Sequence, residues 1–193
     1  MSMIRRIFVE KKDAFAVEAH GLLADLRNNL GMTALKNIRM MNRYDVMGLN
    51  DEEFAMAKKL VLSEPPVDKV LEEELALEAG AHAFAVELLP GQYDQREDFA
   101  EQCIQLITQK DRPMVAAAKV YVLEGELSED EVAKIKAYCI NPIEAREAEW
   151  GKPETLESTC EEPAKIARVA GFLTMTREEA EARAAQQKAE AAS

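Results

Sequence analysis

Residues 84–108, FAVELLPGQYDQREDFAEQCIQLIT, contain the pattern on which the predicted fold depends: a strand, a polar turn and a helix. Apolar residues alternate with smaller or polar ones over 84–88, which is the period of a half-buried strand. A Pro-Gly pair then marks a turn. Asp94 is followed three residues later by Glu97, which is typical of a helix N-cap and its partner. The apolar residues after this cap predict one buried stripe on the helix: Phe99, Cys103, Leu106 and Ile107.

The turn between this strand and helix holds a dense cluster of polar side chains: Gln92, Tyr93, Asp94, Gln95 and Arg96. A strand-to-helix junction offers free backbone N–H groups, and Arg96 adds a guanidinium, so the junction suits an anion or a polar partner surface. Capping alone explains Asp94 and stabilises a helix by about 1 kcal/mol. Two interpretations therefore stand side by side, a plain helix cap and a contact site for a substrate or partner. The second rests on Gln, Tyr, Gln and Arg occurring together beyond what capping requires.

The same order of elements occurs 77 residues earlier in the chain. Ile7 then aligns with Phe84, and Tyr44 aligns with Tyr121. The second helix of each copy needs an offset of 78 and opens with a capping signature, NDEE in one copy and SEDE in the other. A register kept over four elements predicts two copies of one unit. Where the second copy has its polar turn, the first has the more apolar DAFAVEA.

Each copy is predicted to contain a strand, a helix, an extended segment, a second helix and a closing strand. In the first copy these are expected at 5–11, 17–30, 37–49, 51–62 and 67–77, where a helix is the alternative for the last. In the second they are expected at 84–88, 94–108, 113–124 and 128–140, with Trp150 packing the last strand onto the domain. We therefore predict an α+β fold of two units, residues 1–78 and 79–150, each an antiparallel sheet backed by two helices and related by a pseudo-twofold axis. A linker over 151–175 and an Ala- and Glu-rich helical tail over 176–193, which frays, complete the prediction.

The charge balance limits the classes of partner. With 24 Lys and Arg against 36 Asp and Glu, the net charge is -12, which disfavours nucleic acid because phosphate binding needs a basic face. No apolar run approaches the ~18 residues of a membrane span. The start, MSMIRRIFVEKK, lacks the apolar region of a secretory signal, so we expect a cytoplasmic protein without nucleic-acid or membrane partners.

The residues that most often carry chemistry form no recognisable catalytic or metal set. The three cysteines, Cys103, Cys139 and Cys160, show no CxxC pairing, and the first two fall on apolar helix faces, so we predict buried, reduced thiols. His20 and His82 have no neighbours at metal-ligand spacing. The sequence has no Gly-rich phosphate loop, GxSxG or HExxH. We therefore predict no catalytic residue, metal site or cofactor site in this chain.

Several segments together resemble the N-terminal region of the single-chain phosphoribosylformylglycinamidine synthases: RRIFVEKK, GLLADLRNNLG, NRYDV, SEPPVDKV, FAVELLPGQYDQR, AAKVYVLEG and INPIEARE. The resemblance covers about residues 4 to 173, and GQYDQR is its most specific part. In that family the region is similar to two fused copies of the small subunit PurS. The resemblance thus implies a tandem of two PurS-like α+β units, in agreement with the internal repeat.

The resemblance also implies a function. The family converts an amide to an amidine with ATP and with ammonia from glutamine, and its synthetase and glutaminase domains lie beyond the region resembled here. ATP and Mg²⁺ would bind the synthetase domain, so this chain is expected to be non-catalytic and to partner those domains in cis or in trans, as a fragment or as an accessory subunit. The implied contact residues are Gln92, Tyr93, Asp94, Gln95 and Arg96, with Arg96 holding an acidic group. A small-molecule-sensing module is the alternative function, and an independent enzyme is a third.

Overall fold

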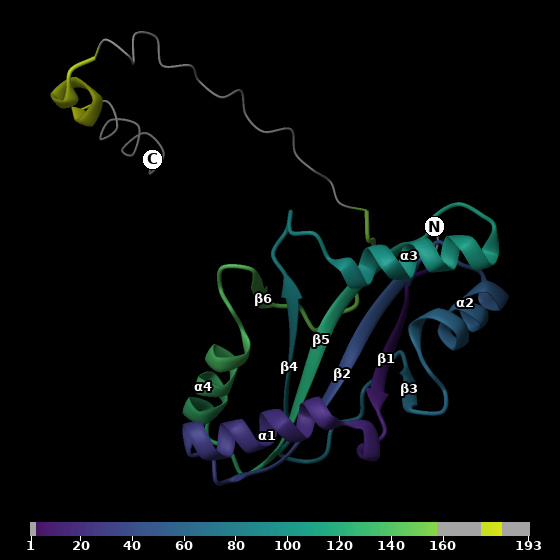
Figure 1. The fold of residues 1–193 in the computed structure, drawn as a ribbon, viewed down its shortest axis with the longest axis horizontal. Helices are drawn as coiled ribbons and strands as arrows, with labels where there is room; N and C mark the ends of the chain where they lie inside the picture. Colours follow the sequence, from purple (N-terminus) through teal and green to yellow (C-terminus); the bar gives the residue numbers. More distant parts are fainter. Residues whose placement is uncertain (1–2, 158–174, 183–193) are drawn as a thin grey trace. The chain divides into compact units, whose positions relative to one another are not determined.

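The computed structural model describes residues 3–157 and 175–182 of the 193-residue chain. The chain divides into two compact units, Met1–Glu157 and Ser158–Ser193. The described part of the first unit carries the sheet and the labelled helices (Figure 1). In the second unit, Thr176 and Glu179 exchange the hydrogen bonds of the predicted capping box and open a helix over 177–182. Most of the predicted linker and tail, including Cys160, lies outside the described residues.

A single antiparallel sheet organises the first unit, which confirms the predicted α+β class. Its six strands are β1 (Arg5–Lys11), β2 (Leu35–Met47), β3 (Asp68–Glu72), β4 (His82–Leu88), β5 (Met114–Gly125) and β6 (Ala145–Glu147). Their order across the sheet is β3-β1-β2-β5-β4-β6, so the two long strands β2 and β5 pair at the centre. The segment 67–77, where a strand or a helix was predicted, is a strand over the five residues of β3.

The α-helices in the described part of the first unit are α1 (Val17–Leu30), α2 (Asp51–Ala57), α3 (Gln95–Thr108) and α4 (Glu129–Cys139). The starts of α2, α3 and α4 and the end of α1 lie where the capping residues predict. Asn50 and Ser128 each complete a capping box with the glutamate three residues on, at the starts of α2 and α4. Gly31 ends α1 in the left-handed conformation that glycine adopts without strain. A π-helical turn, Lys58–Leu62, extends α2 and lies against α3.

One face of the sheet, the helical face, is covered by these helices, and α1 and α3 cross it at opposite ends (Figure 1). Two apolar cores lie beneath them. Ile104 of α3 packs with Phe54 of α2 and with Ile7 and Tyr44 of the strands. The second core joins α1 to α4 over the other end of the sheet: Leu26, Phe84, Tyr121 and Ile135. Each core therefore combines a helix from the first half of the chain with one from the second.

The opposite face of the sheet, the far face, carries a third core of alternate strand residues covered by connecting segments. Beside it, Arg6 of β1 makes a bidentate ion pair with Asp45 of β2, at 2.6 and 2.7 Å, and both side chains are buried. Arg6 also donates to the carbonyl oxygens of Trp150 and Gly151, at 2.6 and 3.1 Å. Arg43 donates to the carbonyl of Glu149 at 2.8 Å. These bonds hold the backbone of residues 149–151 on the far face.

The expectations for Trp150 and for the two helical cysteines need correction. The Trp150 ring does not pack the last strand down, because it remains 42% exposed while its backbone carbonyl makes the contact with Arg6. Cys103 and Cys139 are free thiols, but both are partly rather than fully buried. Burial nonetheless raises the pKa of the Cys139 thiol to about 11.

Candidate functional site

The polar turn before α3 is a helix cap, as the sequence predicts. The Asp94 carboxylate accepts hydrogen bonds from the backbone N–H groups of Arg96 and Glu97, at 2.7 and 3.2 Å. Gly91 has a positive φ of 88°, which a side chain would strain, and so allows the sharp turn out of β4. Asp94 is therefore explained by local structure alone.

The remaining polar residues of the turn separate into two groups. Gln92 and Tyr93 are exposed, and the Tyr93 hydroxyl donates to Asp98 at 2.6 Å, which raises the pKa of Tyr93. Arg96 is also exposed, but its Nη1 donates to the Tyr44 hydroxyl of the sheet at 3.3 Å. Of the five predicted residues, the structure brings Asp94, Gln95 and Arg96 to the lining of one hollow and leaves Gln92 and Tyr93 outside that lining.

This hollow, called the α3 hollow below, lies between α3 and the π-helical turn and has a volume of about 640 Å³. Its lining is mainly apolar, with Arg96 among the few charged groups: Tyr44, Val61, Leu62, Asp94, Gln95, Arg96, Phe99 and Ala100. Two smaller hollows, of about 370 and 220 Å³, are also lined by Arg96. The Arg96 guanidinium is thus shared by three hollows on the helical face.

The two smaller hollows share a polar pair at the centre of the sheet that sequence reasoning missed. Asn42 of β2 and Lys119 of β5 stand directly opposite each other on the helical face. Lys119 forms an ion pair with Glu18 of α1. The signal was present in the sequence, because a lysine interrupts the inward row Val115, Ala117, Tyr121 of β5 at the position where an apolar residue is expected.

The predicted apolar stripe of α3 is wrong as a buried set, because two of its four residues are exposed and the other two, Cys103 and Ile107, are only partly buried. Phe99 is 65% exposed and Leu106 is 75% exposed, whereas Ala100 and Ile104 are buried. We call Phe99, Cys103 and Leu106 the outer stripe; they lie at the i, i+4, i+7 spacing of one helix face. A side-chain set of this kind on a helix is ordinarily buried against another element.

The reason for this rotation of α3 is a hydrogen-bonding requirement of β5. This strand pairs with β4 only from Lys119 to Leu123, so its earlier residues have no β4 partner. Glu97 accepts a hydrogen bond from the backbone N–H of Ala117 at 2.7 Å, and Glu101 accepts one from Val115 at 2.9 Å. Since buried backbone donors need acceptors, the two glutamates face the sheet and the large apolar residues face away.

The inward position of Glu97 changes its protonation. Burial raises the pKa of its carboxyl from 4.5 to about 7, and the nearby carboxylates of Asp94, Glu101 and Glu87 act in the same direction. The hydrogen bond from Ala117 opposes this shift in pKa. Glu97 therefore titrates near neutral pH, beside the candidate site.

The described part of the chain shows neither a metal-binding cluster nor a membrane-spanning helix. Across residues 3–157 and 175–182, no three His, Cys, Asp or Glu side chains gather where they could hold a metal ion. None of the helices in this part of the chain has the length and apolar content that crossing a membrane requires.

No family model matches the sequence, and no curated protein matches it.

Proposed function

We propose that the chain is an N-terminal PurS-like domain, or a free accessory subunit, of phosphoribosylformylglycinamidine synthase, the ATP- and glutamine-dependent ligase of de novo purine biosynthesis. In this role it is cytoplasmic and non-catalytic alone. It packs on the synthetase domain and helps to form the active site or the ammonia path. ATP and Mg²⁺ bind the synthetase domain, and ammonia comes from the glutaminase domain.

The observation that carries this proposal is the outer stripe of α3, which lies directly after the GQYDQR turn. Single exposed apolar residues are common on protein surfaces. Here Phe99 and Leu106 stand on one helix face with Cys103 between them, and the neighbouring hollow holds Arg96. Burying a side chain of that size stabilises an interface by roughly 1.5–3 kcal/mol, so the outer stripe suits a permanent partner.

The strand register supports the tandem of PurS-like units that this function implies. Cross-strand pairs of the first half recur 77 residues later in the second half. The pair Ile7–Tyr44 corresponds to Phe84–Tyr121, and the pair Val9–Val70 corresponds to Val86–Glu147. The strand order is β3-β1-β2 in one half of the sheet and, read from the opposite edge, β6-β4-β5 in the other half. Each strand of the first half thus takes the same place as the strand three numbers later in the second half. Asn42 pairs directly with Lys119, its own counterpart. We infer that a pseudo-twofold axis passes through this pair and relates two fused copies.

The test is binding to a synthetase fragment that lacks its own N-terminal region. Size-exclusion chromatography and calorimetry with the synthetase portion of a single-chain enzyme should show a stable one-to-one complex. Leu106→Lys should weaken binding at least tenfold, about 1.4 kcal/mol. The matched control is Ile143→Lys, the same change at an apolar side chain that is 82% exposed after α4. No complex with the unchanged chain, or equal losses in both variants, would remove the proposal.

A small-molecule-sensing module is the second candidate, favoured by the three hollows that share Arg96. In that case the isolated chain should bind a purine intermediate or an amino acid at micromolar strength, about -8 kcal/mol. Calorimetry and thermal shift with both ligand classes distinguish the two candidates. Binding that disappears in Arg96→Met would favour the sensor.

A further inference from the structure

We propose that the α3 hollow is a socket for one protruding segment of the partner polypeptide. The segment presents a large apolar side chain, which lies between Phe99 and Val61, and an Asp or Glu carboxylate, which pairs with Arg96. This inference rests on the proposed function and specifies the chemistry of the partner. It concerns the residues that line the hollow, whereas the proposed function rests on the outer stripe of α3.

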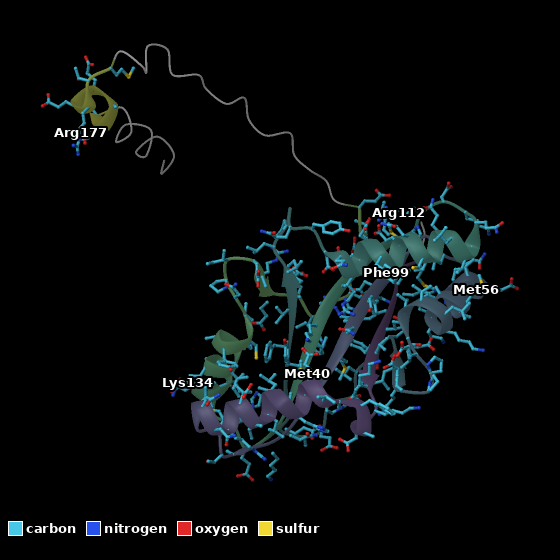
Figure 2. The ribbon with its side chains drawn as sticks, in the orientation of Figure 1. Met40, Met56, Phe99, Arg112, Lys134 and Arg177 are labelled. Carbon is cyan, nitrogen blue, oxygen red and sulfur yellow. The ribbon has the colours of Figure 1, made fainter. Side chains whose placement is uncertain are left out.

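The lining of the α3 hollow supplies the apolar half of this recognition. Leu62 and Ala100 are buried and form its floor, while Val61 is partly exposed on the side of the π-helical turn. Phe99 stands largely in solvent on the α3 side, and Figure 2 shows it on the part of the helix that crosses the sheet. The hollow is open to solvent, and its volume of about 640 Å³ admits several side-chain groups rather than one methyl.

Arg96 supplies the charged half. Within residues 3–157, its guanidinium makes one hydrogen bond, to the Tyr44 hydroxyl at 3.3 Å, and no carboxylate lies within ion-pair distance. Other arginines of this unit are paired: Arg6 with Asp45, Arg39 with Glu10 and Arg146 with Glu87. Arg27 also has no carboxylate partner, but its guanidinium donates to the carbonyl oxygens of Leu35 and Lys36, at 2.9 and 3.0 Å. Within residues 3–157, Arg96 has neither a carboxylate nor a backbone carbonyl as a partner. Its remaining donors suit the two oxygens of a carboxylate from outside the chain.

The equivalent place in the first half of the chain serves as an internal comparison. At the offset of 77 residues, Ala19 replaces Arg96 and Leu22 replaces Phe99. Ala19 is buried, and Leu22 packs on the core around Tyr121, the counterpart of Tyr44. The first half therefore fills this place with its own side chains. At this place the α3 hollow has an arginine and a phenylalanine, where the first half has an alanine and a leucine.

The nearby lysine does not offer a competing site for the carboxylate. Lys119 lines the two smaller hollows but is already paired with Glu18 of α1. Lys11, at the far end of the 370 Å³ hollow, is paired with Asp68 at 2.9 Å and with Glu64, and these contacts raise its pKa. Arg96 is thus the cation in this region with capacity for a new anionic partner.

Binding of the same synthetase fragment tests the socket separately from the outer stripe. Arg96→Met keeps the length of the side chain and removes the charge; it should weaken binding at least tenfold with an unchanged Tm, and Arg96→Lys should recover part of the loss. Val61→Trp, which fills the hollow, should weaken binding similarly. Arg146→Met, at an arginine already paired with Glu87, is the control and should bind normally.

A photo-cross-linking residue at position 99 identifies the occupant. The cross-linked segment should contain a large apolar residue and an Asp or Glu within one helical turn of it. Normal binding by both Arg96→Met and Val61→Trp, with a loss in Leu106→Lys, overturns the socket and leaves the proposed function intact. A cross-linked segment without an acidic residue also overturns it. No binding by the unchanged chain overturns both proposals.

Discussion

Replacing Glu97 with glutamine removes the carboxyl that titrates near neutral pH while keeping its shape. The glutamine side-chain oxygen can still accept the hydrogen bond from the Ala117 N–H that Glu97 accepts at 2.7 Å. The variant therefore isolates the effect of charge on the attachment of α3 to β5. It leaves the backbone donor of the strand satisfied.

The pKa of Glu97 fixes the sign and the size of the effect. Because the folded pKa is raised from 4.5 to about 7, the folded state holds the proton more tightly than the unfolded state. The associated stability is fully present below pH 4.5 and is lost as the pH rises to about 7. A difference of this size corresponds to about 3 kcal/mol at most. Partial exposure and solvent screening reduce it to roughly 1–2 kcal/mol.

Urea denaturation at pH 5 and at pH 8 measures this dependence. The free energy of unfolding of the unchanged chain should fall by about 1–2 kcal/mol between the two pH values through Glu97. Glu97→Gln should lose that part of the dependence and be the more stable protein at pH 8. Glu126→Gln, an exposed glutamate after β5, is the control and should follow the unchanged chain. Parallel pH curves for Glu97→Gln and the unchanged chain would refute the argument.

Three further substitutions test the fold, each by urea denaturation. Arg6→Met removes the closer of the two arginines that pair with the buried Asp45, and Arg43 remains at 3.7 Å. The variant should lower the free energy of unfolding by about 3 kcal/mol, and the double variant with Asp45→Leu should recover part of this loss. Full stability in the single variant would contradict the role of the pair. Asp94→Ala removes the cap of α3 and should lower the free energy of unfolding by about 1 kcal/mol, whereas Asp94→Asn should leave it nearly unchanged. Gly125→Ala should lower the free energy of unfolding by more than about 1 kcal/mol, because the φ of Gly125 is 148° and a Cβ would lie 2.2 Å from the carbonyl oxygen of Ala34. An unchanged urea midpoint would be inconsistent with that geometry.

Local chemistry made most of the secondary structure predictable. The two capping boxes, the Asp94 cap and the glycine after α1 fix helix ends through neighbours a few residues away. Alternation in 5–11 and 113–124 is enough to identify strands. The offset between the two halves could not predict that all six strands join in one sheet.

The orientation of α3 could not be predicted from its own residues. By hydrophobicity, Phe99 and Leu106 belong inside and Glu97 and Glu101 outside, and the reverse is observed. The deciding factor is that the pairing of β4 with β5 ends at Val86 and Lys119, which leaves donors of β5 without partners in β4. That information is not local to the helix.

The candidate site was predictable in part. The turn GQYDQR identified Arg96, but the sequence gives no sign that Gln92 and Tyr93 lie outside the hollow. Asn42 and Glu18 are unremarkable in sequence and become part of the site because β2 pairs with β5 and α1 crosses the sheet beside them.

The bonds from Arg6 and Arg43 to the backbone of residues 149–151 have a mechanical consequence. A pull along the chain from beyond Glu157 meets these bonds before it reaches the short strand β6. The load then passes through a buried ion pair into the two strands β1 and β2 rather than peeling an edge strand from the sheet. Under force, the domain should resist at this anchor first and yield only when the guanidinium groups release the chain.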